Sequence, residues 1–216
     1  MAFKHPNIFW DWDGTIANTM PVYFRVFQET HQHFNLPHLS EEHFHKNTAT
    51  TSQKHFSSLL PEAHVAGAIN YCYSLLDKYS DEVQLFPEAQ GWLEAAAVLG
   101  SRNIIVSNKT HLQLIKDIKR FKLEHLIAAA VGGTELTNHK PHPDHMHLAA
   151  QRAGVAVSAS DAMVGDSPAD YEIAKAAGTY AYLLHSQVYD FKEIIKNNPK
   201  ASVVSRPLLH KTLFQS

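Results

Sequence analysis

The sequence predicts an α/β protein with a Rossmann-like parallel sheet, helices on both faces of that sheet, and an inserted α-helical cap domain. From residue 86 onward, short apolar runs alternate with helical periods, which is the pattern of successive βαβ units. Residues 18–84 show helical periods and no convincing strand, directly after the first apolar run. We therefore expect a core made of residues 1–17 and 85–216 and a cap domain made of residues 18–84.

The first strand is predicted at Asn7–Asp11, an apolar run that ends in a turn containing Gly14. Pro21 can open the following helix, because proline is tolerated in the first helical turn. Apolar residues then recur at helical spacing through the insert, except in the polar stretch 46–54. The insert is therefore expected to contain helices on both sides of this stretch.

The remaining chain alternates regularly between the two kinds of pattern. In chain order it predicts a strand at 103–106, a helix through 112–118, a strand at 127–131, a helix at 143–153, a strand at 162–164, a helix at 169–177, a strand at 180–184 and a short strand at 203–204. Gly154 and Gly178 follow two of these helices, at the position where glycine commonly ends a helix.

Composition narrows the class of protein. The 216 residues are 44% hydrophobic and 19% charged, which is enough for one substantial domain or a core with a smaller insert. The formal net charge of −2 provides no basic field for nucleic acid. No apolar run approaches the roughly 18 residues that span a bilayer, and Cys72 is the single cysteine. We expect a cytoplasmic protein with neither nucleic acid nor membrane as a partner.

Polar residues gather at the carboxyl ends of the predicted strands, where open α/β sheets bind their ligands. The runs are Asp11-Trp12-Asp13-Gly14-Thr15, Ser107-Asn108, Lys140-Pro141-His142-Pro143-Asp144 and Gly165-Asp166-Ser167-Pro168-Ala169-Asp170. Each run alone is more often a turn, a helix cap or a solvated surface. Together, in order and at successive strand ends, they supply carboxylates, hydroxyls and an ammonium group, which suit a metal ion and a phosphate.

With these motifs the chain resembles the haloacid dehalogenase-like hydrolase superfamily. Its insert resembles the helical cap of the phosphoglycolate phosphatase-like and β-phosphoglucomutase-like branch. The resemblance implies a Mg²⁺-dependent phosphatase that hydrolyses a small phosphorylated metabolite through an aspartyl-phosphate intermediate. Asn18 and Glu88 depart from this branch, which often has Asp and Gly at those positions. Both residues lie at the expected hinges between cap and core, so they bear on subfamily and cap motion.

The chemistry of the residues agrees with the catalytic roles that the resemblance implies. Asp11 is the expected nucleophile, because a carboxylate on an exposed turn can attack phosphorus in line. Asp13 is the expected acid and base, which protonates the leaving oxygen and later accepts a proton from water. The charge of the transferring phosphoryl group needs positioned donors and cations. The residues expected to bind it are Thr15, Ser107, Asn108 and Lys140, of which Lys140 is also counted as catalytic.

The cofactor expected at these strand ends is Mg²⁺. Three carboxylates, those of Asp11, Asp166 and Asp170, would repel one another without a cation, and oxygen ligands suit magnesium. The resemblance adds the backbone carbonyl of Asp13 as a further ligand. It also implies that Asp170 acts through water or by orienting its neighbours.

Substrate specificity is expected in the cap, because the core contacts only the phosphate. Thr50, Thr51 and Lys54 are the candidates for contact with the leaving group, although an ordinary solvated loop explains each of them equally well. Several histidines lie close to Lys140 in the sequence, among them His142. In a chain with 16 histidines such clusters arise from composition, so we do not predict a transition-metal site there.

Four alternatives stay open. A dehalogenase of this fold would not need Asp13 as an acid. A phosphonate hydrolase could use Lys46 or Lys54 as a Schiff-base amine, but such enzymes usually carry a small residue in place of Asp13. A sugar-phosphate mutase keeps every core residue and differs mainly in the cap, so the sequence excludes it least. A non-catalytic regulatory protein that binds a phosphate ligand is disfavoured by the intact motifs.

Overall fold

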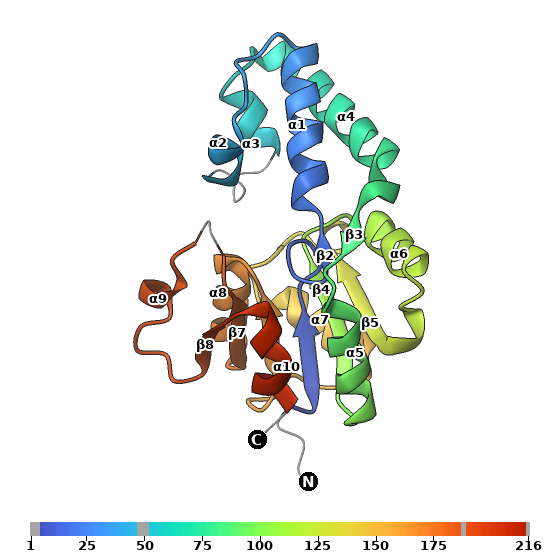
Figure 1. Cartoon of the computed structure of the whole chain (residues 1–216), viewed down its shortest axis with the longest axis vertical. Helices are drawn as coiled ribbons and strands as arrows, with labels where there is room; N and C mark the ends of the chain where they lie inside the picture. Colours follow the sequence, from blue (N-terminus) through green and yellow to red (C-terminus); the bar gives the residue numbers. More distant parts are fainter. Residues whose placement is uncertain (1–4, 47–51, 187–188, 215–216) are drawn as a thin grey trace. The chain divides into compact units, whose positions relative to one another are not determined.

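The computed structural model describes residues 5–46, 52–186 and 189–214, and it divides into two compact units (Figure 1). We call Met1–Ala17 together with Leu85–Ser216 the core unit, and Asn18–Gln84 the helical unit. The chain passes between them through the two-residue strands β2 (Ala17–Asn18) and β3 (Gln84–Leu85), which pair with each other. Within the described residues, no helix has the length and apolar character needed to span a bilayer.

The core unit is built on a six-stranded sheet in the order β5-β4-β1-β6-β7-β8. Its strands are β1 (Asn7–Trp10), β4 (Arg102–Ser107), β5 (Ile127–Gly132), β6 (Ala162–Gly165), β7 (Tyr180–Leu184) and β8 (Ala201–Val204). Every pairing is parallel, and Phe9 of β1 lies between Ile104 and Met163 of its neighbours. The predicted strands are confirmed, and the carboxyl ends of all six strands lie along one edge.

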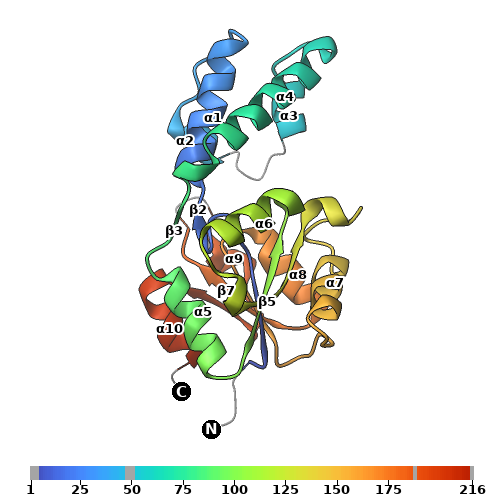
Figure 2. The same cartoon turned by 90° about the vertical axis from the view of Figure 1, so that its right-hand side faces the viewer.

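Helices cover both faces of this sheet, as Figure 2 shows, so the predicted α/β class is confirmed. One face carries α5 (Ala89–Val98) and α10 (Arg206–Phe214), and the other carries α7 (Asp144–Arg152) and α8 (Pro168–Ala177). The remaining helical segments of the core unit are α6 (His111–Arg120), α9 (Phe191–Ile194) and the 3₁₀ turns η2 (Glu124–Leu126) and η3 (Gly133–Glu135). The helices α5, α9 and α10 are not predicted from the sequence.

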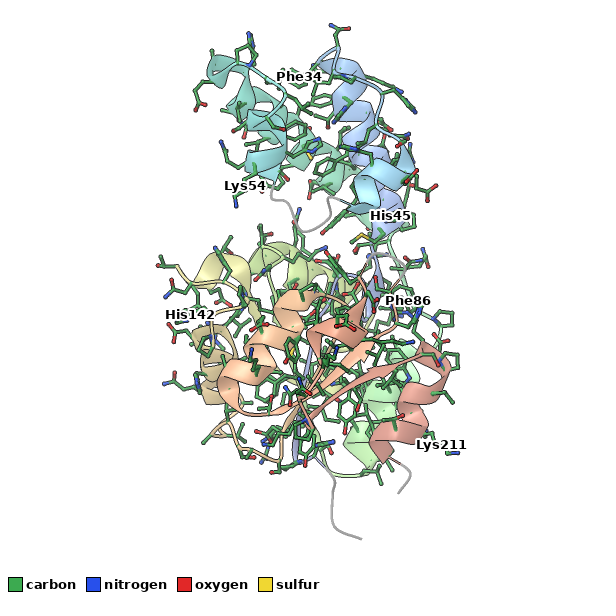
Figure 3. The ribbon with its side chains drawn as sticks, turned by 90° about the vertical axis from the view of Figure 1, so that its left-hand side faces the viewer. Phe34, His45, Lys54, Phe86, His142 and Lys211 are labelled. Atoms are coloured by element: carbon green, nitrogen blue, oxygen red, sulfur yellow. The ribbon has the colours of Figure 1, made fainter. Side chains whose placement is uncertain are left out.

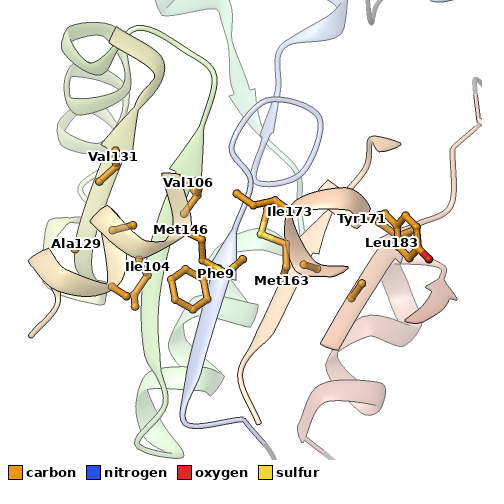
Figure 4. Close-up of a cluster of buried hydrophobic side chains, with 14 of the residues drawn as sticks. Phe9, Ile104, Val106, Ala129, Val131, Met146, Met163, Tyr171, Ile173 and Leu183 are labelled. Carbon is orange, nitrogen blue, oxygen red and sulfur yellow. The ribbon is translucent and has the colours of Figure 1, made fainter. Parts of the chain in front are cut away.

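Alternate residues of β1 supply the apolar cores on the two faces. Phe9 packs in a buried cluster with Ile104, Met146 and Met163, between the sheet and the helices α7 and α8 (Figure 4). On the opposite face, Trp10 stacks on Trp92 of α5, with ring centroids 6.2 Å apart. Burial on both faces explains why β1 reads as a continuous apolar run, which is usual for a central parallel strand.

The helical unit contains α1 (Met20–His33), α2 (Glu41–Lys46), α3 (Ser52–Ser57) and α4 (Glu62–Lys78), followed by the 3₁₀ turn η1 (Ser80–Glu82). Pro21 lies in the first turn of α1, as the sequence indicates. Phe27 of α1 stacks on Phe56 of α3, with ring centroids 5.6 Å apart. Val26 of α1 and Cys72 of α4 are fully buried, so this unit has an apolar core of its own.

Candidate active site

Asp11 is the first residue beyond β1, at the carboxyl edge of the sheet. Its backbone N–H donates to the carbonyl of Val164 at 2.9 Å, which continues the pairing with β6 and fixes the position of the residue. The chain then turns tightly, and the carbonyl of Trp12 accepts hydrogen bonds from the N–H groups of Ile16 and Ala17 at 3.0 and 2.9 Å. Gly14 has φ +82°, and a Cβ there would overlap the Asp166 carboxylate. The turn therefore requires glycine at this position.

The other carboxylates come from the junction between β6 and α8. Ser167 caps the N-terminus of α8, and Pro168 is the first residue of that helix. The backbone N–H and the Oγ of Ser167 both donate to Oδ2 of Asp170, at 3.0 and 2.6 Å. Asp170 is fully buried, and a Cβ on Gly165 would overlap its carboxylate. The strand-to-helix turn thus brings Asp166 and Asp170 to the same edge as Asp11.

Lys140 joins two of these carboxylates. Its Nζ donates to Oδ1 of Asp170 at 2.8 Å and also contacts Oδ1 of Asp11, and its side chain is only 3% exposed. Asn108 fixes the backbone of Lys140, because its Oδ1 accepts the Lys140 N–H at 3.0 Å and its Nδ2 donates to the Lys140 carbonyl at 3.2 Å. The Asn108 side chain therefore positions Lys140.

The electrostatics of this edge favour a bound cation. Asp11, Asp166 and Asp170 each offer a carboxylate oxygen, and these oxygens lie within 4.8 Å of one another. Burial raises the pKa of Asp11 well above its ordinary value, although Lys140 opposes the shift. Burial and then Asp170 raise the pKa of Asp166 to about 7. Burial opposes the charge of Lys140, but Asp11 and Asp170 outweigh it and raise its pKa.

Burial is the main cause of both raised pKa values, and neighbouring carboxylates add to it, so the ionised forms of Asp11 and Asp166 are disfavoured. A divalent cation would favour the ionised carboxylates. Its ligands would be carboxylate oxygens, which magnesium prefers. The residues present therefore fit the Mg²⁺ that the sequence predicts.

The remaining predicted core residues lie beside this cluster. Thr15 is buried and its Oγ1 donates to Oδ1 of Asp166 at 3.3 Å. Ser107 is the buried last residue of β4, and its Oγ accepts the N–H of Lys109 at 3.2 Å. The Asp13 side chain is 17% exposed. All eight predicted core residues thus lie in the core unit, while their catalytic, phosphate-binding and metal-binding roles stay predictions.

The predicted specificity residues belong to the helical unit. Lys54 is an exposed residue of α3 (Figure 3), and Thr50 and Thr51 lie outside the described residues. Their contact with a leaving group therefore stays a prediction. His142, in the core unit, has a side chain that is 47% exposed, with Nδ1 3.2 Å from Oδ2 of Asp144.

Two residues at the site, Lys109 and Arg206, are not predicted from the sequence. Lys109 directly follows Ser107-Asn108, and its Nζ lies 3.1 Å from Oδ1 of Asp13; its place beside the second motif is the signal that could have identified it. Arg206, the first residue of α10, donates to the carbonyls of Gly14 and of Thr15, the latter at 3.0 Å. Its guanidinium lies 3.4 Å from the centre of the Phe86 ring. No local sequence signal identifies Arg206, because only the fold brings it to the turn.

Comparison with known proteins identifies the family of the chain. Residues 8–183 match the family model described as haloacid dehalogenase-like hydrolase. Among curated proteins, the phosphoglycolate phosphatase of Escherichia coli strain K12 is 34% identical over 119 residues, covering 50% of this chain and 47% of that protein. The alignment therefore spans about half the length of that relative.

Solved structures share the fold over nearly the whole chain. A predicted phosphoglycolate phosphatase from Haemophilus somnus 129pt has a TM-score of 0.80 at 21% identity, covering 98% of this chain and 99% of that one. CbbY from Rhodobacter sphaeroides, solved in complex with phosphate, has a TM-score of 0.75 at 18% identity, covering 93% of each chain. At these identities the likeness shows a shared fold.

Proposed function

The chain belongs to the haloacid dehalogenase-like hydrolase family, and from this premise we propose that it is a Mg²⁺-dependent phosphatase that hydrolyses a small phosphomonoester through an aspartyl-phosphate on Asp11. The observation that carries the proposal is the group formed by Asp11, Asp166 and Asp170, whose oxygens lie within 4.8 Å of one another beside the Lys140 ammonium. The Asp11 carboxylate is buried, contacts the fixed ammonium group of Lys140 and lies beside a candidate site for a metal ion. In-line attack on a phosphoryl group requires surroundings of this kind.

In the first step, an oxygen of Asp11 attacks phosphorus while the bond from phosphorus to the leaving oxygen breaks. Asp13, two residues further along the same turn, donates its proton to that leaving oxygen. In the second step, water attacks the phosphorus of the aspartyl-phosphate, Asp13 takes a proton from the water, and Asp11 is released. Lys140 holds Asp11 in place, because its ammonium group contacts both Asp11 and Asp170.

Mg²⁺ would be held by carboxylates of Asp11, Asp166 and Asp170, with the Asp13 carbonyl as the further ligand that the family resemblance implies. When bound, it would neutralise part of the charge on the phosphoryl group. Asp170 already accepts from Ser167 through Oδ2 and from Lys140 through Oδ1. With both oxygens engaged in this way, Asp170 would contribute to the Mg²⁺ site through water or by orienting its neighbours, as the family resemblance implies.

Phosphoglycolate phosphatase is the activity in the name of the E. coli relative, which supports a small phosphorylated metabolite as the substrate class. The core residues contact only the phosphoryl group and the leaving oxygen in this proposal, so they would not distinguish phosphomonoesters by the rest of the leaving group. Phosphoglycolate and a generic aryl phosphate are accordingly the first substrates to examine.

The experiment measures phosphate release from 4-nitrophenyl phosphate and from phosphoglycolate, with Mg²⁺ and after exhaustive chelation. We expect turnover with Mg²⁺, its loss on chelation, and its loss in Asp11→Asn, because a neutral amide cannot act as the nucleophile. Asp190→Asn is the matched control, since Asp190 is an exposed residue that caps α9. Undiminished turnover after chelation, or an active Asp11→Asn variant, would contradict the proposal. With a sugar phosphate as the substrate, transfer of phosphate between positions of the sugar without release would favour a mutase instead.

A further inference from the structure

A chain of charged and polar contacts extends from Asp13 into the interior of the core unit. The Nζ of Lys109 lies 3.1 Å from Oδ1 of Asp13 and 3.2 Å from Oδ2 of Asp117, a residue of α6. The same Oδ2 of Asp117 accepts a hydrogen bond from the indole N–H of Trp12 at 3.1 Å. Since Trp12 immediately precedes Asp13, these contacts close a loop that begins and ends at the same turn.

The loop lies in a largely dry environment. The side chains of Lys109 and Asp117 are 8% and 7% exposed, and Trp12 is fully buried. A buried ion pair adds little net stability over apolar residues of the same volume, because removal of both charges from water is costly. What such a pair does supply is a fixed geometry for the groups it contacts.

We propose that Lys109 and Asp117 are positioning residues that hold the carboxyl of Asp13 in the orientation required for proton exchange with the leaving group and with water. This inference rests on the proposed function. Lys109 donates to Oδ1 of Asp13, so Oδ2 is the oxygen assigned to carry the transferred proton. An acceptor remains at Oδ1 whether Asp13 is protonated or ionised, so Lys109 keeps its contact through both steps.

Asp117 has a separate part in this arrangement. Its Oδ2 contacts the Lys109 ammonium at 3.2 Å, and the Trp12 indole fixes Asp117 in turn. Asp117 therefore holds Lys109 in the position from which it contacts Oδ1 of Asp13.

The test compares 4-nitrophenyl phosphate, which has a good leaving group, with phenyl phosphate, which is close in shape but has a poor one. General acid catalysis contributes about 10²–10⁴-fold, and a poor leaving group needs more of it. Lys109→Met should therefore lower kcat/KM for phenyl phosphate about tenfold or more beyond its effect on 4-nitrophenyl phosphate. Asp117→Asn should show the same selectivity with a smaller loss, because its amide oxygen can still accept from Trp12.

A double variant separates positioning from a general structural role. Asp13→Asn combined with Lys109→Met should be no slower on phenyl phosphate than Asp13→Asn alone, because the positioned group is already gone. Lys119→Met is the matched control, an exposed lysine on the same helix as Asp117, and it should leave the ratio of the two substrates unchanged. Thermal unfolding of every variant shows whether it is folded.

Equal losses of kcat/KM on both substrates in Lys109→Met, or additive losses in the double variant, would overturn the proposal. Neither result would contradict the proposed phosphatase function. If Lys109→Met does not fold, the substrate ratio of Asp117→Asn decides. Failure of both variants to fold would mean that the pair supports the fold and not Asp13, which also overturns the proposal. A parent protein with no Mg²⁺-dependent turnover of either substrate would overturn the proposed function itself.

Discussion

The ammonium group of Lys140 lies 2.8 Å from Oδ1 of Asp170, although 30 residues separate the two in the chain. The same ammonium contacts Asp11, so one cation joins the end of β1 to the start of α8. The Asn108 side chain accepts from the Lys140 N–H and donates to the Lys140 carbonyl, which adds the end of β4 to this arrangement. Three strand ends that are far apart in the sequence are therefore held together by one buried residue.

Replacement of Lys140 tests how much its contacts with Asp11 and Asp170 contribute to stability and to turnover. Lys140→Met should lower the free energy of unfolding by about 3–5 kcal/mol in the absence of metal, because it leaves buried carboxylates unpaired. Turnover should be lost as well. Denaturant unfolding followed by tryptophan fluorescence reports on the core unit, which contains Trp10, Trp12 and Trp92.

The control for this variant is Lys196→Met, since the Lys196 side chain is 65% exposed and pairs with Glu193 at 3.4 Å. A surface pair of this kind contributes about 0–1 kcal/mol. A loss in Lys140→Met no larger than that of the control would show that the carboxylates do not depend on Lys140.

Arg206 should support the turn that carries Asp11 and Asp13. In Arg206→Met the carbonyls of Gly14 and Thr15 lose a charged donor, and an unsatisfied buried acceptor costs about 1–3 kcal/mol. We expect lower stability to denaturant together with weaker Mg²⁺ binding by calorimetry. Lys211→Met, at an exposed position of the same helix (Figure 3), is the control. If Mg²⁺ binding and stability both matched those of the control, Arg206 would have no part in the site.

The helical unit should weaken in mild acid because of a histidine pair. Nε2 of His55 lies 2.8 Å from Nε2 of His31. Burial, followed by the nearby His31 and His43, lowers the pKa of His55 to about 4. The folded state thus favours the neutral imidazole, whereas the unfolded chain titrates near 6.5. This stabilisation is fully present above about pH 6.5 and is lost as the pH falls toward 4.

Amide hydrogen exchange of α1 and α4, corrected for the intrinsic effect of pH, measures this loss. His55→Gln cannot take up the proton, so its exchange rates should rise less than those of the parent between pH 7 and pH 5. The difference between the two proteins should be up to about one logarithmic unit per pH unit. His64→Gln, at an exposed position of α4, should behave like the parent. Identical pH dependence in His55→Gln and the parent would show that another group causes the change.

Much of the core could be predicted because local sequence determines it. The apolar run before Asp11, the glycines after two helices and the cap at Ser167 are local signals, and the strand and helices that they indicate are present in the structure. Parallel strands also place their carboxyl ends on one edge, which is why four separate motifs could be assigned to one site from the sequence.

The helices and site residues that are not predicted from the sequence depend on packing between distant segments. α5 is rich in alanine and α10 has a mixed pattern, so neither shows the strong amphipathic period that predicts a helix. From the sequence alone Lys109 resembles a surface lysine, because its partner Asp117 comes close to it only when α6 packs against the core. Arg206 reaches a turn more than 190 residues earlier in the chain, and no sequence pattern encodes that approach.

The most direct measurement of the central claim is identification of the phosphorylated residue. The protein is mixed with 4-nitrophenyl phosphate and Mg²⁺, quenched with acid in the first turnover, and reduced with borohydride, which converts an aspartyl-phosphate to homoserine. Mass spectrometry of the tryptic peptide 5–25 then distinguishes Asp11 from Asp13. We predict homoserine at position 11 in the parent protein and none in Asp11→Asn. Homoserine at another position, or turnover without any modified aspartate, would contradict the assignment of Asp11 as the nucleophile.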